Sequence, residues 1–175
     1  PHPLPTFPRS TVDGFAVRAN DTYGASDSLP IYFTVVGEVP MGSIANLEIA
    51  STQAALIHTG GMLPDGSDAV VMVEHTQTSR KDEIEVLRAV AQGENILRVG
   101  EDVSAGDEVI PAGHRIRPVE IGGLNALGMT HVTVVCKPRV GIISSGDEVV
   151  SPEKELLPGQ VRDINAYTLG ALVQD

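Results

Sequence analysis

The sequence has one cysteine, no tryptophan and few basic residues, and these shortages narrow the class of protein. The single cysteine, Cys136, cannot form an intramolecular disulfide, which favours a reducing compartment and predicts a cytoplasmic protein. Lys and Arg number 12 against 23 Asp and Glu, a net charge of −11. Because binding to a phosphate backbone needs clustered cations, nucleic acid is a poor partner. No apolar run approaches the roughly 20 residues of a membrane span, and no signal-peptide pattern opens the chain, so no membrane partner is expected.

The remaining composition is that of an ordinary globular chain. Hydrophobic residues make up 42% of the 175 residues, with 18 Gly and 12 Pro, which predicts many tight turns and a core of Val, Ile, Leu and Ala. The length suits one domain, or one domain plus the beginning of a second. The start, PHPLPTFPRS, has no Met, which indicates a piece excised from a longer protein.

Short apolar runs bounded by turn residues dominate the first three quarters of the chain. The predicted strands are residues 31–39, 54–59, 69–74 and 83–88. The last of them, EIEVLR, alternates polar and apolar residues, as a strand with one wet face does. This spacing favours a β-rich domain, sandwich or barrel-like, over an array of βαβ units.

Two helices are predicted beyond these strands. The first begins at Pro118, a good first helical residue, and ends before Gly128. The second runs over about residues 165–174, with Asp163 or Asn165 as its cap. Between them, a Lys-Pro step at 137–138 indicates a domain joint. Residues 140–144 then read as the first strand of an α/β unit that the chain does not complete.

Four polar clusters interrupt this scaffold, and each pairs an acid or a hydroxyl with glycine. They are residues 10–18 (STVDGFAVR), 58–71 (HTGGMLPDGSDAVV), 98–107 (RVGEDVSAGD) and 144–148 (SSGDE). Taken singly, each has a structural interpretation, because Asp-Gly pairs form turns and adjacent acids are usually solvated. The fourth cluster stands out, since ligands of open α/β sheets bind where strands end and glycine lets the backbone approach them.

Taken in order, the clusters and their flanking residues resemble the MoeA family, the molybdopterin molybdotransferases, whose eukaryotic counterpart is the E domain of gephyrin. The motifs are SxxDGFAVR, TGGxLPxGxDAVVxxE, NILRxGEDV, PRVGIISSGDEV and LxPGQVRDINAY. The resemblance covers nearly the whole chain, and no single motif bears it alone. Three departures from the family pattern are small and conservative. Val12 stands where the family usually has Met or a similar long residue, Gly61 where it commonly has Ala, and Ser145 where it usually has Thr.

The resemblance implies a mixed α+β chain in two parts. Residues 1–137 would be the β-rich, elongated N-terminal region (domains I and II) without its first helices, and residues 138–175 the beginning of a molybdopterin-binding α/β domain. The family inserts molybdenum from molybdate into adenylylated molybdopterin and releases AMP, with Mg²⁺ as the usual divalent ion, and acts as a homodimer. The chain by itself is then expected to be inactive.

The resemblance also implies site residues. Asp13 matches the family's essential aspartate, and Thr59, Asp102 and Glu148 match other catalytic positions. Gly60, Gly61, Ser145 and Gly146 are the candidates for binding the cofactor precursor, and Asp102 and Glu148 also for Mg²⁺.

The chemistry of these residue types suits that function. Molybdate and adenylylated pyrophosphate are anions, so carboxylates must hold a cation, a water or a neutral hydroxyl. Mg²⁺ takes one or two carboxylates and keeps several waters, which suits Asp102 and Glu148. Thr59 can donate its O–H to an anion, helped by exposed N–H groups of Gly60 and Gly61. Asp13 can orient a proton or a water.

Two rival hypotheses remain at this stage. One is a non-catalytic scaffold or binding module of the gephyrin type, and the other a small nucleotide-binding β domain whose glycine turns imitate the motifs. A further 200 or so residues with a Gly/Ser-rich loop in the parent reading frame would favour the enzyme. His58 is interpreted as a packed or loop histidine, and Cys136 as a small core residue.

Overall fold

The computed structural model describes residues 2–174, and the chain is mixed α+β, with most of its strands in the first half. It divides into a first unit that ends at Thr130 and a second that begins at His131. This boundary falls a few residues before the Lys137-Pro138 step at which the sequence places the domain joint. The assignment of residues 1–137 and 138–175 to two named domains stays a prediction.

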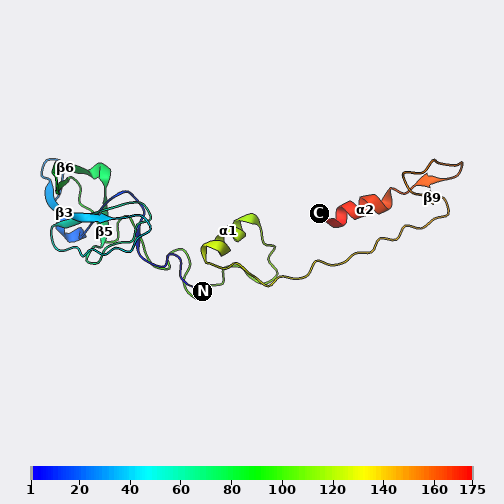
Figure 1. The fold of residues 1–175 in the computed structure, drawn as a ribbon, viewed down its shortest axis with the longest axis horizontal. Coiled ribbons are helices and arrows are strands. Elements are labelled where there is room, and N and C mark those ends of the chain that lie inside the picture. The colour runs from blue at the N-terminus through cyan, green and yellow to red at the C-terminus, as the bar shows by residue number, and fades with distance from the viewer. Residues whose placement is uncertain (1, 175) are drawn as a thin grey trace. The chain divides into compact units, whose positions relative to one another are not determined.

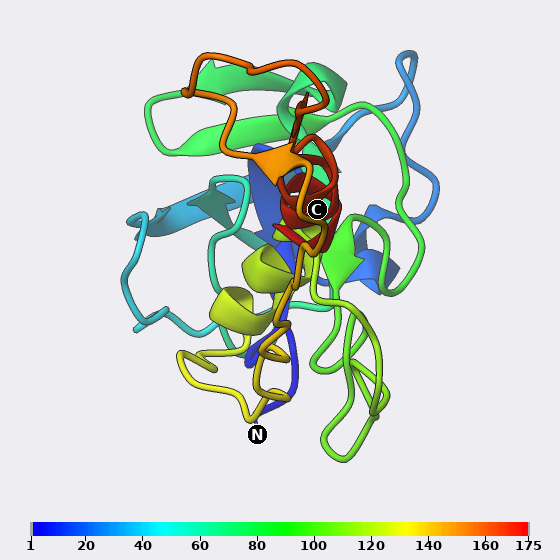
Figure 2. The same cartoon turned by 90° about the vertical axis from the view of Figure 1, so that its right-hand side faces the viewer.

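A six-stranded sheet forms the centre of the first unit (Figure 1). Its strands, in the order β5-β2-β4-β3-β7-β6, pair antiparallel except for the parallel pair β3 and β4. Their bounds are β2 Gly14–Val17, β3 Ile31–Val39, β4 Gln53–Ile57, β5 Ala69–Met72, β6 Thr76–Arg80 and β7 Glu83–Val86. Figure 2 shows the β6–β7 hairpin, in green, at one end of this sheet.

The predicted strands are confirmed in position. The sheet contains two further strands, β2, which lies inside the first polar cluster, and β6, for which no strand is predicted. The part of the sheet formed by β2 and β5 is buried on both faces, because successive residues of these strands enter different apolar clusters. Val17 and Val71 pack with Phe33 on one face, and Ala16 and Val70 pack with Val39 and Ile57 on the other. A sequence buried on both faces has no polar–apolar alternation, which is why β2 escaped prediction.

Short elements frame the sheet. The two-residue strands β1 (Arg9–Ser10) and β8 (Ile96–Leu97) pair antiparallel. Single turns of 3-10 helix, η1 (Ala19–Thr22) and η2 (Val73–His75), follow β2 and β5.

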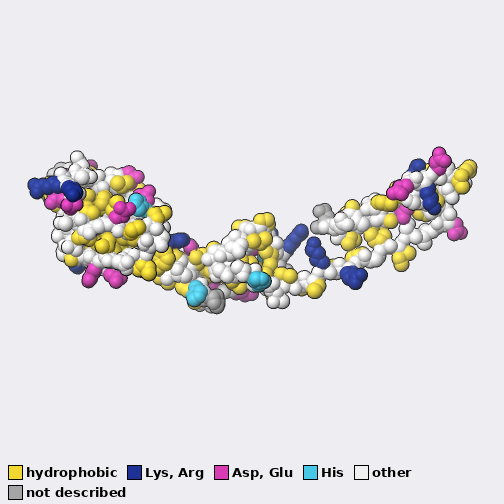
Figure 3. Space-filling model, viewed as in Figure 1, with side chains coloured by type: hydrophobic (Ala, Val, Ile, Leu, Met, Phe, Trp, Pro, Cys, Tyr) yellow, Lys and Arg dark blue, Asp and Glu magenta, His cyan; other side chains and the backbone are white. Residues whose placement is uncertain are grey.

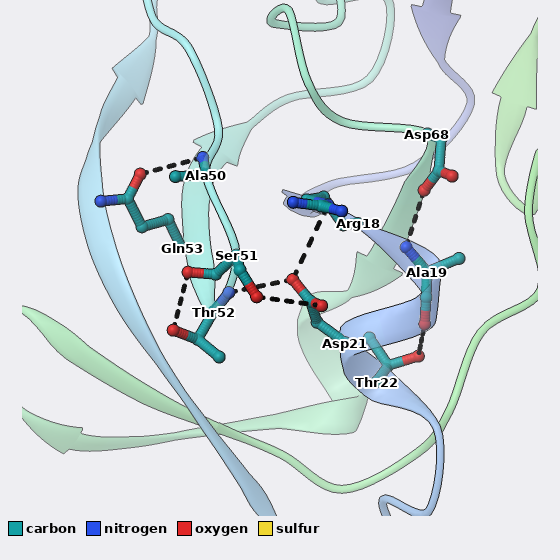
Figure 4. A network of polar contacts seen from close by, with 9 residues as sticks. All are labelled: Arg18, Ala19, Asp21, Thr22, Ala50, Ser51, Thr52, Gln53 and Asp68. Atoms are coloured by element: carbon teal, nitrogen blue, oxygen red, sulfur yellow. Dashed lines mark hydrogen bonds and ion pairs between the residues drawn. The ribbon is translucent and has the colours of Figure 1, made fainter.

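Two aspartates fasten η1 to its surroundings, as Figure 4 shows. Asp68 Oδ1 accepts the backbone N–H of Ala19 at 2.7 Å. Asp21 accepts the backbone N–H of Thr52 at 2.9 Å and the hydroxyl of Ser51 at 3.2 Å. Thr52 has a φ of 57°, which a β-branched residue seldom adopts, so the Asp21 contact stabilises a strained turn. Asp68 of the second polar cluster therefore has a structural role.

Helix α1 (Pro118–Ala126) closes the first unit and begins and ends as predicted. Pro118 is its first residue, and Gly128, with a φ of 73°, follows its end. Glu120 accepts the backbone N–H of Arg117 at 2.9 Å and pairs with the Arg117 guanidinium. These contacts lower the pKa of Glu120 to about 2, the Arg117 side chain being the largest cause. Across residues 2–174, no helix has the length and apolar character needed to span a membrane.

The second unit contains β9 (Val149–Val150) parallel to β10 (Val161–Arg162), and helix α2 (Asn165–Gln174). Asp163, one of the two predicted caps, accepts the N–H of Ala166 at 3.0 Å. The predicted strand at 140–144 is wrong: a strand needs a neighbour for its backbone groups, and within the described chain this segment has none. None of residues 131–174 is buried, so Cys136 is exposed and its interpretation as a small core residue is wrong. Figure 3 shows apolar side chains at the surface of this unit.

Candidate functional site

Asp13 and Thr59, which lie 46 residues apart in sequence, are in direct contact in the first unit. Oδ1 of Asp13 accepts the backbone N–H of Thr59 at 2.7 Å and its hydroxyl at 3.0 Å. Two donors on one carboxylate oxygen fix the direction of the side chain. The other oxygen, Oδ2, has no partner among the described residues, and the Asp13 side chain is 64% exposed, so this oxygen faces solvent.

The sheet brings these two residues together. Asp13 immediately precedes β2, Thr59 follows the end of β4, and the two antiparallel strands pair Gly14 with Ile57. The loop before Asp13 is held by buried Ser10, whose hydroxyl donates to the carbonyl of Val12 at 2.6 Å. The carbonyl of Asp13 itself accepts the N–H of Val73 at 3.1 Å. The contact therefore rests on a packed core rather than on a free loop.

Glycine is required at two positions of this site. A Cβ added to Gly14 would lie 2.0 Å from the carbonyl oxygen of Val71 on the neighbouring strand. The Asp-Gly pair is thus explained by the close approach of β5, and not by turn geometry alone. Gly60 has a φ of 83°, the left-handed region that glycine adopts without strain.

The backbone N–H groups expected to face an anion already donate hydrogen bonds to backbone carbonyls. The N–H of Gly60 donates to the carbonyl of Ser10 and that of Gly61 to the carbonyl of His58, both at 2.8 Å. The Thr59 hydroxyl donates to Asp13. The expectation of free donors on Thr59, Gly60 and Gly61 therefore fails in this structure, because the turn satisfies its own polar groups. An anion would have to displace the Asp13–Thr59 hydroxyl bond to gain a donor here.

Electrostatics keep Asp13 ionised. Its pKa is lowered from the ordinary value mainly by the backbone N–H of Thr59, then by the Thr59 hydroxyl, and to a smaller extent by the charge of His58. Hydrogen bonds to a carboxylate favour its charged form, so the side chain is an acceptor over the physiological pH range.

Asp102 lies in the same unit but bonds elsewhere. Its carboxylate is 3.8 Å from the Arg9 guanidinium, and its backbone N–H donates to the carbonyl of Leu4 at 3.0 Å. Arg9 also adjoins Met62 just after the Thr59 turn, and Ser10 bonds to Gly60 and Gly61. Strand β1 therefore connects the loop of Asp102 to the Asp13–Thr59 contact.

The remaining candidates, Ser145, Gly146 and Glu148, lie in the second unit. Gly146 accepts the N–H of Val149 in a turn, and Glu148 Oε2 is 2.9 Å from where a Cβ on Gly146 would lie. The backbone carbonyl of Glu148 accepts the N–H of Val161, which starts the β9–β10 pair. Gly146 also lines a surface cavity of about 360 Å³ beside α2. A glycine at a cavity wall leaves room for a ligand to approach the backbone.

The carboxylates suit Mg²⁺ in their chemistry, but each belongs to a different unit. Within residues 2–174, no three or more His, Cys, Asp or Glu side chains cluster as a metal site would. Mg²⁺ can be held by one or two carboxylates together with waters and substrate oxygens. Asp102 and Glu148 therefore suit the ion by residue type alone, and a site shared by the two stays a prediction.

The structure adds two residues that the sequence analysis did not assign to the site. His58 Nε2 lies 3.0 Å from Glu38 Oε1, and His58 Nδ1 lies 3.9 Å from Asp13 Oδ1. His58 is interpreted above as a packed or loop residue, and the structure shows it partly exposed between two acids. The sequence feature that could have indicated this contact is the position of Glu38 and His58 near the ends of two predicted strands. Their pairing, however, depends on the register of β3 with β4.

The fold and the site together define a β-rich module that presents an anchored, ionised aspartate beside a threonine-glycine turn. Sequence comparison gives the family. The model of the MoeA N-terminal region (domain I and II) matches residues 1–128, which end two residues before the boundary of the first unit. The chain belongs to the MoeA family.

Relatives of known name are similar over nearly the entire chain. The molybdopterin molybdenumtransferase of Bacillus subtilis is 40% identical over 168 residues, which cover 94% of this chain and 39% of that protein. Molybdopterin molybdenumtransferase 2 of Mycobacterium tuberculosis is 38% identical over 175 residues, 100% of this chain and 43% of that protein. The chain thus spans about two fifths of the length of these relatives.

Solved structures show the same fold. The crystal structure of the molybdopterin biosynthesis MoeA protein from Pyrococcus horikoshii OT3 has a TM-score of 0.90 and 40% identity, covering 98% of this chain and 45% of that one. A second structure of a MoeA protein from the same organism gives a TM-score of 0.85 and 37% identity, with 99% and 44% covered.

Proposed function

We propose that the protein to which this chain belongs inserts molybdenum from molybdate into adenylylated molybdopterin and releases AMP. Support comes from membership of the MoeA family and from relatives named molybdopterin molybdenumtransferase. In this proposal the chain supplies one part of the active site, through Asp13, Thr59 and Asp102, and Glu148 follows at the start of the next domain.

The observation that carries the proposal is the anchoring of Asp13 by Thr59. With Oδ1 held by two donors and Oδ2 open to solvent, the carboxylate has one direction in which it can accept a proton or orient a water. Preorganisation of this kind lowers the cost of aligning reacting groups. Asp13 is therefore the acceptor that orients the water or hydroxyl group at the reacting oxyanion.

Asp102 and Glu148 are the proposed ligands of a Mg²⁺ ion. The ion supplies positive charge against the phosphate and oxo groups of the two anionic substrates. Arg9, 3.8 Å from Asp102, holds that carboxylate in its loop and compensates its charge when no ion is bound. Ser145 and Gly146 are the proposed contacts to the adenylylated pterin, and of these two Gly146 lines the cavity beside α2.

We further propose a cytoplasmic homodimer. Val119 and Ile121 of α1 are 69% and 52% exposed, and these neighbouring apolar side chains offer a surface on which a second copy could pack. Pairing with a second copy would remove this surface from water. Light scattering of the full-length protein should give twice the mass of one full-length subunit, and a monomer at high concentration would contradict the proposal.

Release of AMP by the full-length protein tests the proposed function. Wild-type protein with adenylylated molybdopterin, molybdate and Mg²⁺ should release AMP, and Asp13→Asn should reduce the rate by about a hundredfold or more with a nearly unchanged Tm. Asp102→Asn and Glu148→Gln should bind the pterin normally and need more Mg²⁺ for the same rate. Full activity of Asp13→Asn would refute the role of Asp13.

A further inference from the structure

His58 connects two acids that lie on different strands. Its ring follows β4 immediately before Thr59, with Nε2 3.0 Å from Oε1 of Glu38 on β3 and Nδ1 3.9 Å from Oδ1 of Asp13. The distance to Glu38 is that of a hydrogen bond, and the distance to Asp13 is that of an ion pair. One imidazole thus has a carboxylate at each of its nitrogens.

The placement of Glu38 is fixed by the sheet. In the parallel pair of β3 and β4, Glu38 is in register with Leu56 and Val39 with Ile57. Val39 and Ile57 are buried, so Glu38 and His58 on either side of them project outward from the packed layer. The hydrogen bond that His58 Nε2–H donates to the Glu38 carboxylate then restricts rotation of the ring.

The ring acts on the oxygen of Asp13 that is already held. Oδ1 accepts both bonds from Thr59, and it is also the oxygen nearest to His58 Nδ1. When the His58 ring is protonated, it attracts Oδ1 from a second direction, which opposes rotation of the carboxylate and so keeps Oδ2 directed to solvent. A neutral side chain in place of His58 would leave Thr59 as the only constraint.

We propose that His58, oriented by Glu38, is a positioning residue for Asp13: it holds Oδ1 in place so that Oδ2 meets the substrate in one orientation. This inference rests on the proposed function, since it assigns His58 to the same site. Because His58 acts through Asp13, its loss should slow turnover more than it weakens substrate binding. Because Glu38 acts through His58, its loss should matter only while His58 is present.

The test uses AMP release by the full-length protein carrying His58→Gln, Glu38→Gln or both. Gln at position 58 keeps a hydrogen-bond donor for Glu38 but cannot be protonated, so it offers Asp13 no positive charge. We expect His58→Gln to lower kcat about tenfold with KM for adenylylated molybdopterin within about twofold, and Glu38→Gln to lower kcat about threefold. The double variant should match His58→Gln alone.

His114→Gln is the matched control. His114 Nε2 pairs with Glu120 at 3.2 Å, and its side chain is 36% exposed, the same as that of His58. The control should keep kcat within about twofold of wild type, since His114 has no contact with Asp13. A loss equal to that of His58→Gln would show a general effect of removing a paired histidine, and would overturn the inference.

A readout without turnover is the titration of the Asp13 carboxyl by ¹³C NMR, with its signal identified by its absence in Asp13→Asn. The charge of His58 contributes to the lowered pKa of Asp13. His58→Gln should therefore raise that pKa toward its ordinary value, and His114→Gln should not.

The outcomes separate this inference from the proposed function. If Asp13→Asn is inactive while His58→Gln keeps wild-type kcat and the wild-type Asp13 pKa, His58 has no positioning role and the proposed function stands. If Asp13→Asn is active, the proposed function fails. Should His58→Gln not fold, Glu38→Gln decides alone, and unchanged kcat in that variant would overturn the inference. If the reduction of kcat in the double variant equals the product of the two single reductions, Glu38 does not act through His58, and the inference is contradicted.

Discussion

The two units of the chain differ in how their site residues are supported. In the first unit, Asp13 and Thr59 adjoin strands whose core residues, such as Phe33 and Val71, are fully buried. In the second, Glu148 adjoins a two-residue strand pair, and none of residues 131–174 is buried. In the first unit, buried residues therefore hold the site side chains in place. In the second unit, the motif at residues 144–148 has no buried residues to support it.

Truncation of a core residue should show the largest contrast between the units. Phe33 is 0% exposed, and Phe33→Ala should reduce the free energy of unfolding by about 3–5 kcal/mol. Leu172 in α2 is 66% exposed, and Leu172→Ala should change it by less than about 0.5 kcal/mol. Urea unfolding of the chain measures both. Equal losses would show that α2 is packed in solution, and would remove the contrast.

A smaller effect is expected from a methyl group at the site. Gly14→Ala should cost about 1–3 kcal/mol, because the new Cβ would meet the carbonyl oxygen of Val71. Gly122→Ala on α1 is the control, since nothing lies within 4 Å of its added Cβ. That substitution should stabilise the helix by up to about 1 kcal/mol. The same change from Gly to Ala would then lower the stability of the first unit at position 14 and raise it at position 122. Tolerance of Gly14→Ala would mean that β5 does not pair closely with β2 there.

The smallest expected effect is a loss of stability at the start of helix α1 at acid pH. The pKa of Glu120 is about 2 in the folded chain, below its ordinary value of 4.5, chiefly because of Arg117. The contribution of Glu120 to α1 is therefore fully present above pH 4.5 and is lost as pH falls through about 2. Glu120→Gln should remove this dependence. NMR titration of the Glu120 carboxyl checks the value, and a midpoint near 4.5 would contradict the pairing with Arg117.

Predictability from the sequence depends on the local signals of each element and not on the unit to which it belongs. Strand β3 was predicted with its observed bounds because its β-branched and aromatic residues match an extended conformation. Helix α1 was predicted because Pro118 and Gly128 mark its limits. Strand β2 was missed because its GFAV sequence lies inside a polar motif and is buried on both faces of the sheet.

The site was predicted residue by residue, but its contacts were not. The resemblance to the MoeA family indicated Asp13 and Thr59 separately, and only the pairing of β2 with β4 brings them into contact. Glu38 and His58 depend in the same way on the register of β3 and β4. Residues 140–144 show the reverse case, in which a good strand sequence forms no strand without a neighbour.

Hydrogen exchange of the chain tests the central contrast most directly, because exchange rates report local opening. We expect slow exchange for the amides of β2 and β4 and for the Thr59 N–H, which is bonded to Asp13. We expect fast exchange for residues 140–144, which form no strand. Thr59 protection should disappear in Asp13→Ala while β2 and β4 stay protected. Fast exchange at Thr59 in the wild-type chain, or protection of residues 140–144 equal to that of β4, would contradict the claim that the packed sheet holds the Asp13–Thr59 contact in place.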